Sequence, residues 1–262
     1  MKLVLKVLIL SLTILPISLW GQDWKLLKTM KLNSQPVAFS TDIQGNFYLG
    51  FQDGRLMKFD PNGIRLENFA LSNKSEITLV DVQNNLKPFL FYFDNQQITI
   101  LDRFSSVPKN YHIGDFGLGL VSIACPAPDG DFWILGNNPQ RLLKVNTLRK
   151  SIVLEVQVSL GDTVKQMQTY QNLLLIGDED GLKIFDQFGA IIHTINIEAL
   201  TNFQVINEEI YVYSSEWIYI INPFKGNIIS KLSMPDIQSS AMLKIKNDFI
   251  TIQSKKVIFF QK

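Results

Sequence analysis

The stretch DIQGNFYLGFQDGRLMKFDPNG, residues 42–63, contains the unit from which this chain is built. Two apolar segments, 46–52 and 56–60, flank Asp53-Gly54, and a second turn sequence, Pro61-Asn62-Gly63, follows them. Aromatic and β-branched residues favour strands. Asp-Gly is a strong hairpin signal, because a type I′ turn needs positive φ at both central positions. The stretch therefore predicts two antiparallel strands joined by a tight turn.

The same unit recurs along the chain. Six apolar segments end in a residue whose side chain is expected to accept hydrogen bonds from the N–H groups of the next turn. These final residues lie 36 to 44 positions apart and are Asp60, Asp102, Asn146, Asp186, Asn222 and Gln261. With the apolar segments around them, they give units of four short antiparallel strands, which is the composition of a propeller blade. The sequence predicts an all-β fold, a six-bladed β-propeller with four-stranded blades.

The two ends of the chain predict how the ring closes. The sixth unit stops at Gln261-Lys262, after its third strand, whereas WKLLKTMKL (24–32) is a strand-like segment that belongs to no unit. We expect this N-terminal strand to complete the last blade, which removes exposed sheet edges. The alternatives are a β-sandwich, which does not require a regular four-strand period, and a β-solenoid, whose coils are usually shorter.

Two segments carry a resemblance to known propellers. Residues 42–63 and APDGDFWILG (127–136) resemble the blades of the NHL-like and PQQ-like propeller superfamilies, whereas the Gly-His and Trp-Asp dipeptides of WD40 repeats are absent. The resemblance covers nearly all of residues 23–262 and implies the fold, not a site. The Trp20-Gly21-Gln22 sequence is similar to the ends of signal peptides in Bacteroidota envelope proteins.

The first residues have the layout of a secretory signal peptide. Lys2 and Lys6 precede an apolar run, 7–20, and Gly21 follows it. The run is shorter than the roughly 20 apolar residues of a membrane anchor, and no cysteine stands at the expected cut. We expect cleavage of a signal peptide 1–21, a propeller domain 22–262, no lipid anchor, no transmembrane segment after cleavage, and a periplasmic or secreted location.

Charge and reactive residues limit the function. Loss of residues 1–21 reduces Lys+Arg from 25 to 23 against 24 acidic residues. A mature chain with net charge −1 lacks the basic excess of nucleic-acid binders, so no nucleic-acid partner is expected. The chain has one cysteine, Cys125, expected to be a buried apolar residue, and two histidines, His112 and His193. A nucleophilic cysteine needs a base beside it. The prediction is a non-catalytic chain without cofactor.

Six residues are candidates for contact with a ligand or partner. Tyr111, His112 and Asp115 lie in the glycine-rich stretch 111–119, which we expect to connect the second and third blades. Long loops on rigid scaffolds often carry function. Glu76, Asp162 and Asp236 precede inner strands of three different units. They are either solvated loop residues or acids that converge at one mouth of the channel, where oxygen ligands would suit calcium. No metal site is predicted.

These observations favour a binding or scaffold module, monomeric by itself, whose partner is another protein of the cell envelope. Fold alone does not determine function. Two alternatives remain: a metal-dependent hydrolase similar to the lactonases and lyases among six-bladed propellers, and a propeller that senses a small ligand.

Overall fold

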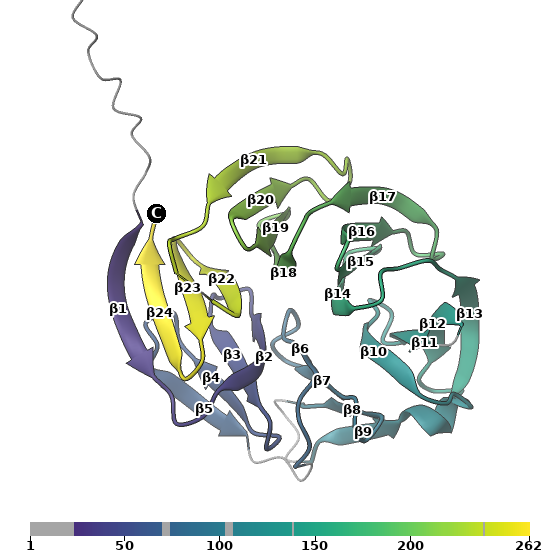
Figure 1. Cartoon of the computed structure of the whole chain (residues 1–262). Coiled ribbons are helices and arrows are strands. Elements are labelled where there is room, and N and C mark those ends of the chain that lie inside the picture. Colours follow the sequence, from purple (N-terminus) through teal and green to yellow (C-terminus); the bar gives the residue numbers. More distant parts are fainter. Residues whose placement is uncertain (1–23, 70–73, 103–106, 138, 238) are drawn as a thin grey trace, which may run out of the picture.

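The computed structural model describes residues 24–69, 74–102, 107–137, 139–237 and 239–262. In these residues the strands form six four-stranded antiparallel sheets. The sheets are arranged as blades around a central channel (Figure 1). The prediction of a six-bladed β-propeller is confirmed.

Each blade runs from an inner strand beside the channel to an outer strand on the rim (Figure 1). Blade 1 consists of β2 (Pro36–Thr41), β3 (Phe47–Phe51), β4 (Leu56–Phe59) and β5 (Arg65–Phe69). Blade 2 consists of β6 (Leu79–Asp81), β7 (Phe89–Tyr92), β8 (Gln97–Ile100) and β9 (Lys109–His112). Blade 3 consists of β10 (Val121–Pro126), β11 (Phe132–Asn137), β12 (Gln140–Asn146) and β13 (Ser151–Gln157).

The other three blades repeat this order. Blade 4 consists of β14 (Val164–Tyr170), β15 (Leu173–Asp178), β16 (Gly181–Phe185) and β17 (Ile191–Asn196). Blade 5 consists of β18 (Leu200–Ile206), β19 (Glu209–Ser214), β20 (Trp217–Ile221) and β21 (Ile228–Ser233). Blade 6 consists of β22 (Ala241–Ile245), β23 (Asp248–Gln253), β24 (Lys256–Gln261) and, from the other end of the chain, β1 (Lys25–Lys31).

The N-terminal strand closes the ring. β1 pairs antiparallel with β24, in a register that runs from Lys25 opposite Gln261 to Lys31 opposite Lys256. The indole of Trp24 packs edge-on against Phe249, with ring centroids 5.1 Å apart. Closure by the first described strand is therefore as the sequence predicts, and blade 6 has four strands like the others.

The recurring Asp and Asn residues shape the turns that follow them. Oδ1 of Asp60 accepts hydrogen bonds from the N–H of Ile64 at 2.7 Å, and Oδ1 of Asp186 accepts one from Ala190 at 2.9 Å. Oδ1 of Asn222 accepts one from the N–H of Phe224 at 3.0 Å. This bonding confirms the expected physical role of the repeat's final residue.

The core lies between neighbouring blades. Buried apolar side chains from blades 2, 3 and 4 form one cluster, and blades 6 and 1 share another around Phe47 and Phe259. The ring of Phe132 in blade 3 contacts Phe89 and Tyr111 of blade 2, with centroids 5.5 and 5.1 Å away. Each sheet is therefore stabilised by burial against its two neighbours.

One element differs from the sequence prediction. The segment VPKNYHI (107–113) predicts an outer strand, but β9 ends at His112 and a 3-10 helix, η1 (Ile113–Phe116), follows it. Ile113 and Phe116 are buried, so the apolar residues of this turn face the core rather than alternating across a sheet. Gly117 ends η1 at φ 71°, a conformation that glycine adopts without strain.

Side-chain amides connect the inner strands of neighbouring blades. Nδ2 of Asn202 donates to the carbonyl of Met242 at 2.8 Å, and Oδ1 accepts from the N–H of Met242 at 3.2 Å. Gln204 makes the same pair of contacts with Lys244, at 3.1 and 2.6 Å. Strands β18 and β22 belong to different sheets and do not pair through their backbones. The side-chain amides of Asn202 and Gln204 supply the hydrogen bonds between them instead.

We predict that Asn202→Ala lowers the free energy of unfolding by about 2 kcal/mol, because the substitution leaves the buried N–H and C=O of Met242 without partners. Urea denaturation of wild type and variant measures the change. Asn196→Ala, an exposed position at the end of β17, is the control and should change stability by less than about 0.5 kcal/mol. Equal effects of the two substitutions would contradict the assigned role of Asn202.

Candidate functional site

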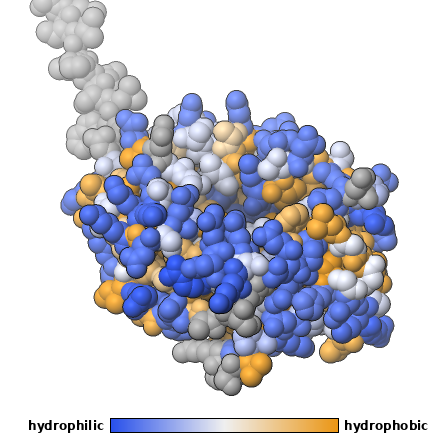
Figure 2. Space-filling model, turned by 60° about the horizontal axis from the view of Figure 1, so that its bottom comes forward, coloured by the Kyte–Doolittle hydropathy of each residue, from blue (hydrophilic) through white to orange (hydrophobic). Residues whose placement is uncertain are grey.

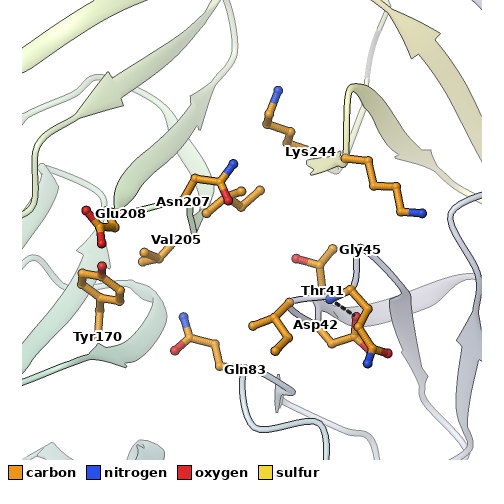
Figure 3. A pocket seen from close by; sticks show the side chains of 13 residues that line it. Thr41, Asp42, Gly45, Gln83, Tyr170, Val205, Asn207, Glu208 and Lys244 are labelled. Carbon is orange, nitrogen blue, oxygen red and sulfur yellow. Dashed lines mark hydrogen bonds between the residues drawn. The ribbon is translucent and has the colours of Figure 1, made fainter.

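A hollow lies where the inner strands of several blades end. It has a volume of about 460 Å³ and collects residues from the carboxyl ends of the inner strands of blades 1, 2, 4, 5 and 6. In Figure 3, Tyr170 and Glu208 border it on one side and Thr41 and Asp42 on the other. The lining residues are Thr41, Asp42, Ile43, Gln44, Gly45, Gln83, Tyr170, Val205, Ile206, Asn207, Glu208, Lys244 and Lys246.

The charges around the hollow are mixed. Lys244 and Lys246 come from blade 6, and Glu208 comes from the first turn of blade 5. Burial lowers the pKa of Lys244, against the opposing effect of Glu209 and Asp248. The carboxylate of Asp42 is occupied by its own turn, since Oδ1 accepts from the N–H groups of Gln44 and Asn46 at 3.0 and 2.9 Å. The hollow therefore offers both donors and acceptors and does not favour one sign of charge.

A small polar space of about 10 Å³, here called the neck, adjoins the hollow between the inner strands. Thr41, Gln83 and Val205 line both spaces. A volume of this size has room for about one water-sized group. The neck is thus separated from the hollow by no more than these three residues.

The acids predicted from the sequence lie at the other end of the inner strands. Glu76, Asp162 and Asp236 are exposed and precede β6, β14 and β22. Among the described residues there is no group of three His, Cys, Asp or Glu side chains that could hold a metal ion. The three acids are solvated loop residues on the mouth opposite the hollow, and a partner contact through them stays a prediction.

The other three predicted residues lie at the boundary of blades 2 and 3. Tyr111 is buried in the core against Phe132, whereas His112 is exposed. The carboxylate of Asp115 pairs with Lys150 at 2.9 Å, and Lys150 lowers the pKa of Asp115. The structure brings this stretch to the rim between the two blades, away from the hollow.

The potential nucleophile and bases lie in different blades. Cys125 is buried in the inner strand of blade 3, and burial raises the pKa of its thiol well above the usual range, with Asp81 adding to the effect. His112 belongs to the outer strand of blade 2. His193 belongs to the outer strand of blade 4, where its Nε2 is 2.8 Å from the carbonyl oxygen of Phe224. The expectation that Cys125 is a buried apolar residue is confirmed.

A second feature is an apolar arc on the rim of blades 3, 4 and 5. Of the 17 large apolar side chains that are exposed in the described part of the chain, nine lie on the outer strands and preceding turns of these blades. We call this set the apolar arc: Leu148, Ile152, Val153, Phe188, Ile191, Ile192, Phe224, Ile228 and Ile229. β13, β17 and β21 follow one another around the outside of the ring (Figure 1).

Contacts between blades join the turns of blades 4 and 5 to the neighbouring outer strands. The turn of blade 5 that carries Phe224 is held on the outer strand of blade 4 by the contact between Phe224 and His193. Gly226 in the same turn has φ 65°, and a Cβ there would lie 2.4 Å from the His193 ring. A Cβ on Gly189, in the turn of blade 4, would lie 3.0 Å from Val156 of blade 3. Glycine at both positions allows each turn to pack closely on the neighbouring blade.

The other half of the rim carries more charge, although Leu26, Leu27, Ile64 and Leu66 are exposed there as well. β1, β5 and β9 carry six charged residues, which are Lys25, Lys28, Lys31, Arg65, Glu67 and Lys109. In β13, β17 and β21 the charged residues are Glu155 and Lys231. Figure 2 turns the side of blades 1 and 2 to the viewer and shows mainly hydrophilic residues there. Charges on an outer strand oppose edge-to-edge pairing, so blades 3 to 5 have the less protected edges.

The sequence analysis did not identify the hollow or the apolar arc. The arc has a partial signal, because apolar pairs lie at or next to the start of the outer strands, at 152–153, 191–192 and 228–229. The hollow has little signal, because the residues that line it belong to separate turns of ordinary composition.

Comparisons with known proteins show the fold. No protein-family model and no curated protein matches the chain. The β-propeller domain of Cps50 (Swd1) from Myceliophteria thermophila superposes with a TM-score of 0.65 at 10% identity, over 91% of this chain and 99% of that chain. Virginiamycin B lyase from Staphylococcus aureus has a TM-score of 0.63 at 11% identity, over 92% of this chain and 100% of that chain.

The chain has the β-propeller fold. BamB from Moraxella catarrhalis, at 14% identity, covers 91% of this chain and 98% of its own with a TM-score of 0.45. At such identities the structural likeness establishes architecture and carries no site from one protein to another. In the described residues, no helix is long and apolar enough to cross a membrane.

The buried carboxyl group of Asp81 in β6 is expected to make the stability of the protein depend on pH. Burial raises its pKa from 3.8 to about 6, against one opposing hydrogen bond from the N–H of Gln83. A raised pKa means that the folded state holds the proton more tightly than the unfolded state. The resulting stability is present below about pH 4 and is lost as the pH rises to about 6.

We predict that Asp81→Asn stabilises the protein at pH 7 relative to wild type, and that this advantage disappears near pH 4. A shift of about two pKa units corresponds to at most about 3 kcal/mol. Thermal unfolding of both proteins between pH 4 and pH 8 measures the difference, with the exposed Asp236→Asn as control. A difference that stays constant across this range would contradict the assigned burial effect.

Proposed function

We propose that this chain is an exported, non-catalytic binding module of the cell envelope, which holds another envelope protein on the apolar arc. The observation that carries the proposal is the grouping of nine exposed large apolar side chains on three successive blades. Contiguous exposed apolar surface on a folded protein marks an interaction site, whereas single exposed apolar residues are ordinary.

Burial of the arc supplies part of the binding free energy of a complex. Several of its side chains are already half-buried, so full burial contributes about 1 kcal/mol for each of them. Nine such contributions sum to about 9 kcal/mol before the cost of association, which is itself several kcal/mol. The partner must therefore add contacts of its own, in keeping with an extended surface rather than a single pocket.

The outer strands also offer backbone hydrogen bonds. β13, β17 and β21 are the last strands of their sheets, so each has one unpaired edge. An extended segment of a partner pairs with such an edge through its main chain, while alternate side chains contact the apolar residues. The partner that fits this surface is a polypeptide with an extended apolar segment, or a concave protein surface that follows the rim.

Export is the second part of the proposal. Residues 1–21, the expected signal peptide, lie outside the described residues. Expression of the full chain in a bacterium with a secretory pathway should yield a product that begins at Gln22, as measured by intact mass and N-terminal sequencing. Retention of residues 1–21 in the purified protein would contradict export with cleavage.

Charged substitutions on blades 4 and 5 test whether the apolar arc binds the partner. We predict that the double substitution Ile192→Lys with Ile229→Lys weakens capture of the native partner at least about tenfold, because each lysine places a charge on an apolar edge. The measurement is affinity capture from envelope extracts of the native organism, followed by quantitative mass spectrometry.

The matched control is Leu66→Lys. This residue has a similar exposure, 49%, but lies on β5, outside the arc. The control should capture the same partner as the wild type. A partner that is captured equally by the double variant, or lost equally in the control, would refute the arc as the binding surface.

A further inference from the structure

One buried polar group in the neck has no partner. Oε1 of Gln168 lies in β14 and has no hydrogen-bond partner among the described residues, although the residue is only 6% exposed. Buried amide oxygens are almost always hydrogen-bonded, because leaving one unpaired costs its lost hydration. Gln168 lines the neck that adjoins the hollow.

The neighbouring polar groups of the neck are occupied. Oε1 of Gln204 accepts from the N–H of Lys244 and from the hydroxyl of Tyr213, both at 2.6 Å. Nε2 of Gln204 donates to the hydroxyl of Thr41 at 2.8 Å, and Oε1 of Gln166 accepts from the N–H of Phe203 at 3.0 Å. These amides hold the blades together, whereas Gln168 points into the neck without such a role.

The size and charge of the neck determine what satisfies Gln168. About 10 Å³ admits a group with one heavy atom. The group must donate a hydrogen bond, because the unpaired atom is an amide oxygen. An ammonium group would need a buried counter-charge, and the polar side chains lining the neck are neutral amides and hydroxyls, from Ser40, Thr41, Gln83, Gln166, Gln168 and Gln204. Neutral donors of this size are a water molecule and a hydroxyl group, and a hydroxyl group is the one that a ligand in the hollow can supply.

The hollow above the neck suits the rest of such a ligand. Gln44, Gln83 and Asn207 supply amides that both donate and accept, while Glu208 and Lys244 add an acceptor and a donor (Figure 3). Tyr170 supplies a ring at the edge. Its volume of about 460 Å³ lies within the range of small-molecule sites. A molecule rich in hydroxyl groups matches these amides, because each hydroxyl group can both donate and accept a hydrogen bond.

We propose that the hollow and the neck form a binding site for a neutral polyhydroxylated molecule, a monosaccharide or disaccharide, with one hydroxyl donating to Oε1 of Gln168. The site is separate from the apolar arc, so it does not depend on the function proposed above. It gives the propeller a small-molecule ligand in addition to a protein partner.

The first measurement is calorimetric titration of the wild type with neutral monosaccharides and disaccharides, with glycerol, and with an amino sugar and a sugar acid as charged probes. At least one neutral sugar should bind with millimolar affinity or better, and the amino sugar and the sugar acid should bind more weakly. Absence of binding by every neutral sugar, or preference for a charged sugar, would overturn the proposal.

The second measurement assigns the hydroxyl to Gln168. Gln168→Leu should weaken binding of that sugar about tenfold, the effect of one lost hydrogen bond. Its melting temperature should be equal to that of the wild type or higher, because the variant removes an unpaired amide. Gln157→Leu, an exposed position on β13, should bind as the wild type does. A Gln168→Leu protein that stays folded and binds unchanged would overturn the assignment.

Deoxy analogues of the sugar make the test independent of folding of the variant. On the wild type, one analogue should lose about tenfold in affinity, and the same analogue should bind Gln168→Leu no more weakly than the parent sugar does. If every single-deoxy analogue binds the wild type as the parent does, no hydroxyl reaches Gln168 and the proposal fails. The Ile192→Lys, Ile229→Lys variant should bind the sugar normally, which separates this result from any failure of the protein-binding function.

Discussion

The pairing of β1 with β24 is the constraint on which the rest of the molecule depends. It joins the first described strand to the last across the whole sequence and fixes the sixth blade between its two neighbours. In the closed ring, the two faces of each blade pack against the two neighbouring blades. The inner strands end around the same opening. The amides of Asn202 and Gln204 join blade 5 to β22, the inner strand of this sixth blade.

The sequence was sufficient for the architecture because the information is local and repeated. The spacing from Asp60 to Gln261 gives the number of blades, and the unmatched segment 24–32 gives the closure. The same local reasoning failed at η1, where buried Ile113 and Phe116 follow tertiary packing rather than strand alternation. The side chain of Gln96, which lies between β7 and β8, bonds both the N–H and the C=O of Val121 in the next blade. Such bridges between sheets have no signature in the local pattern.

The sites were harder to predict than the fold for a geometrical reason. Acids before the inner strands, such as Glu76 and Asp162, mark one mouth of the channel, but the hollow lies at the other. Which end is open depends on the size of turns that come from five separate blades, and no single segment of sequence contains that information. The apolar arc has a partial signal in the sequence, since an apolar pair lies at or next to the start of each outer strand of blades 3 to 5. Only the structure shows that these pairs are exposed rather than part of the core.

The arrangement of four-stranded blades separates the two surfaces physically. The hollow is built from inner strands and their turns, and the apolar arc from outer strands, with two further strands of each sheet between them. Substitutions at positions far apart, without shared contacts, have additive effects. A charge placed on β17 or β21 therefore leaves the amides of β14 and β18 in place, and a ligand in the hollow does not compete for the rim. The proposed ligand in the hollow and the proposed partner on the rim would therefore not exclude each other, and coupling between them would require a change in the packing of whole blades.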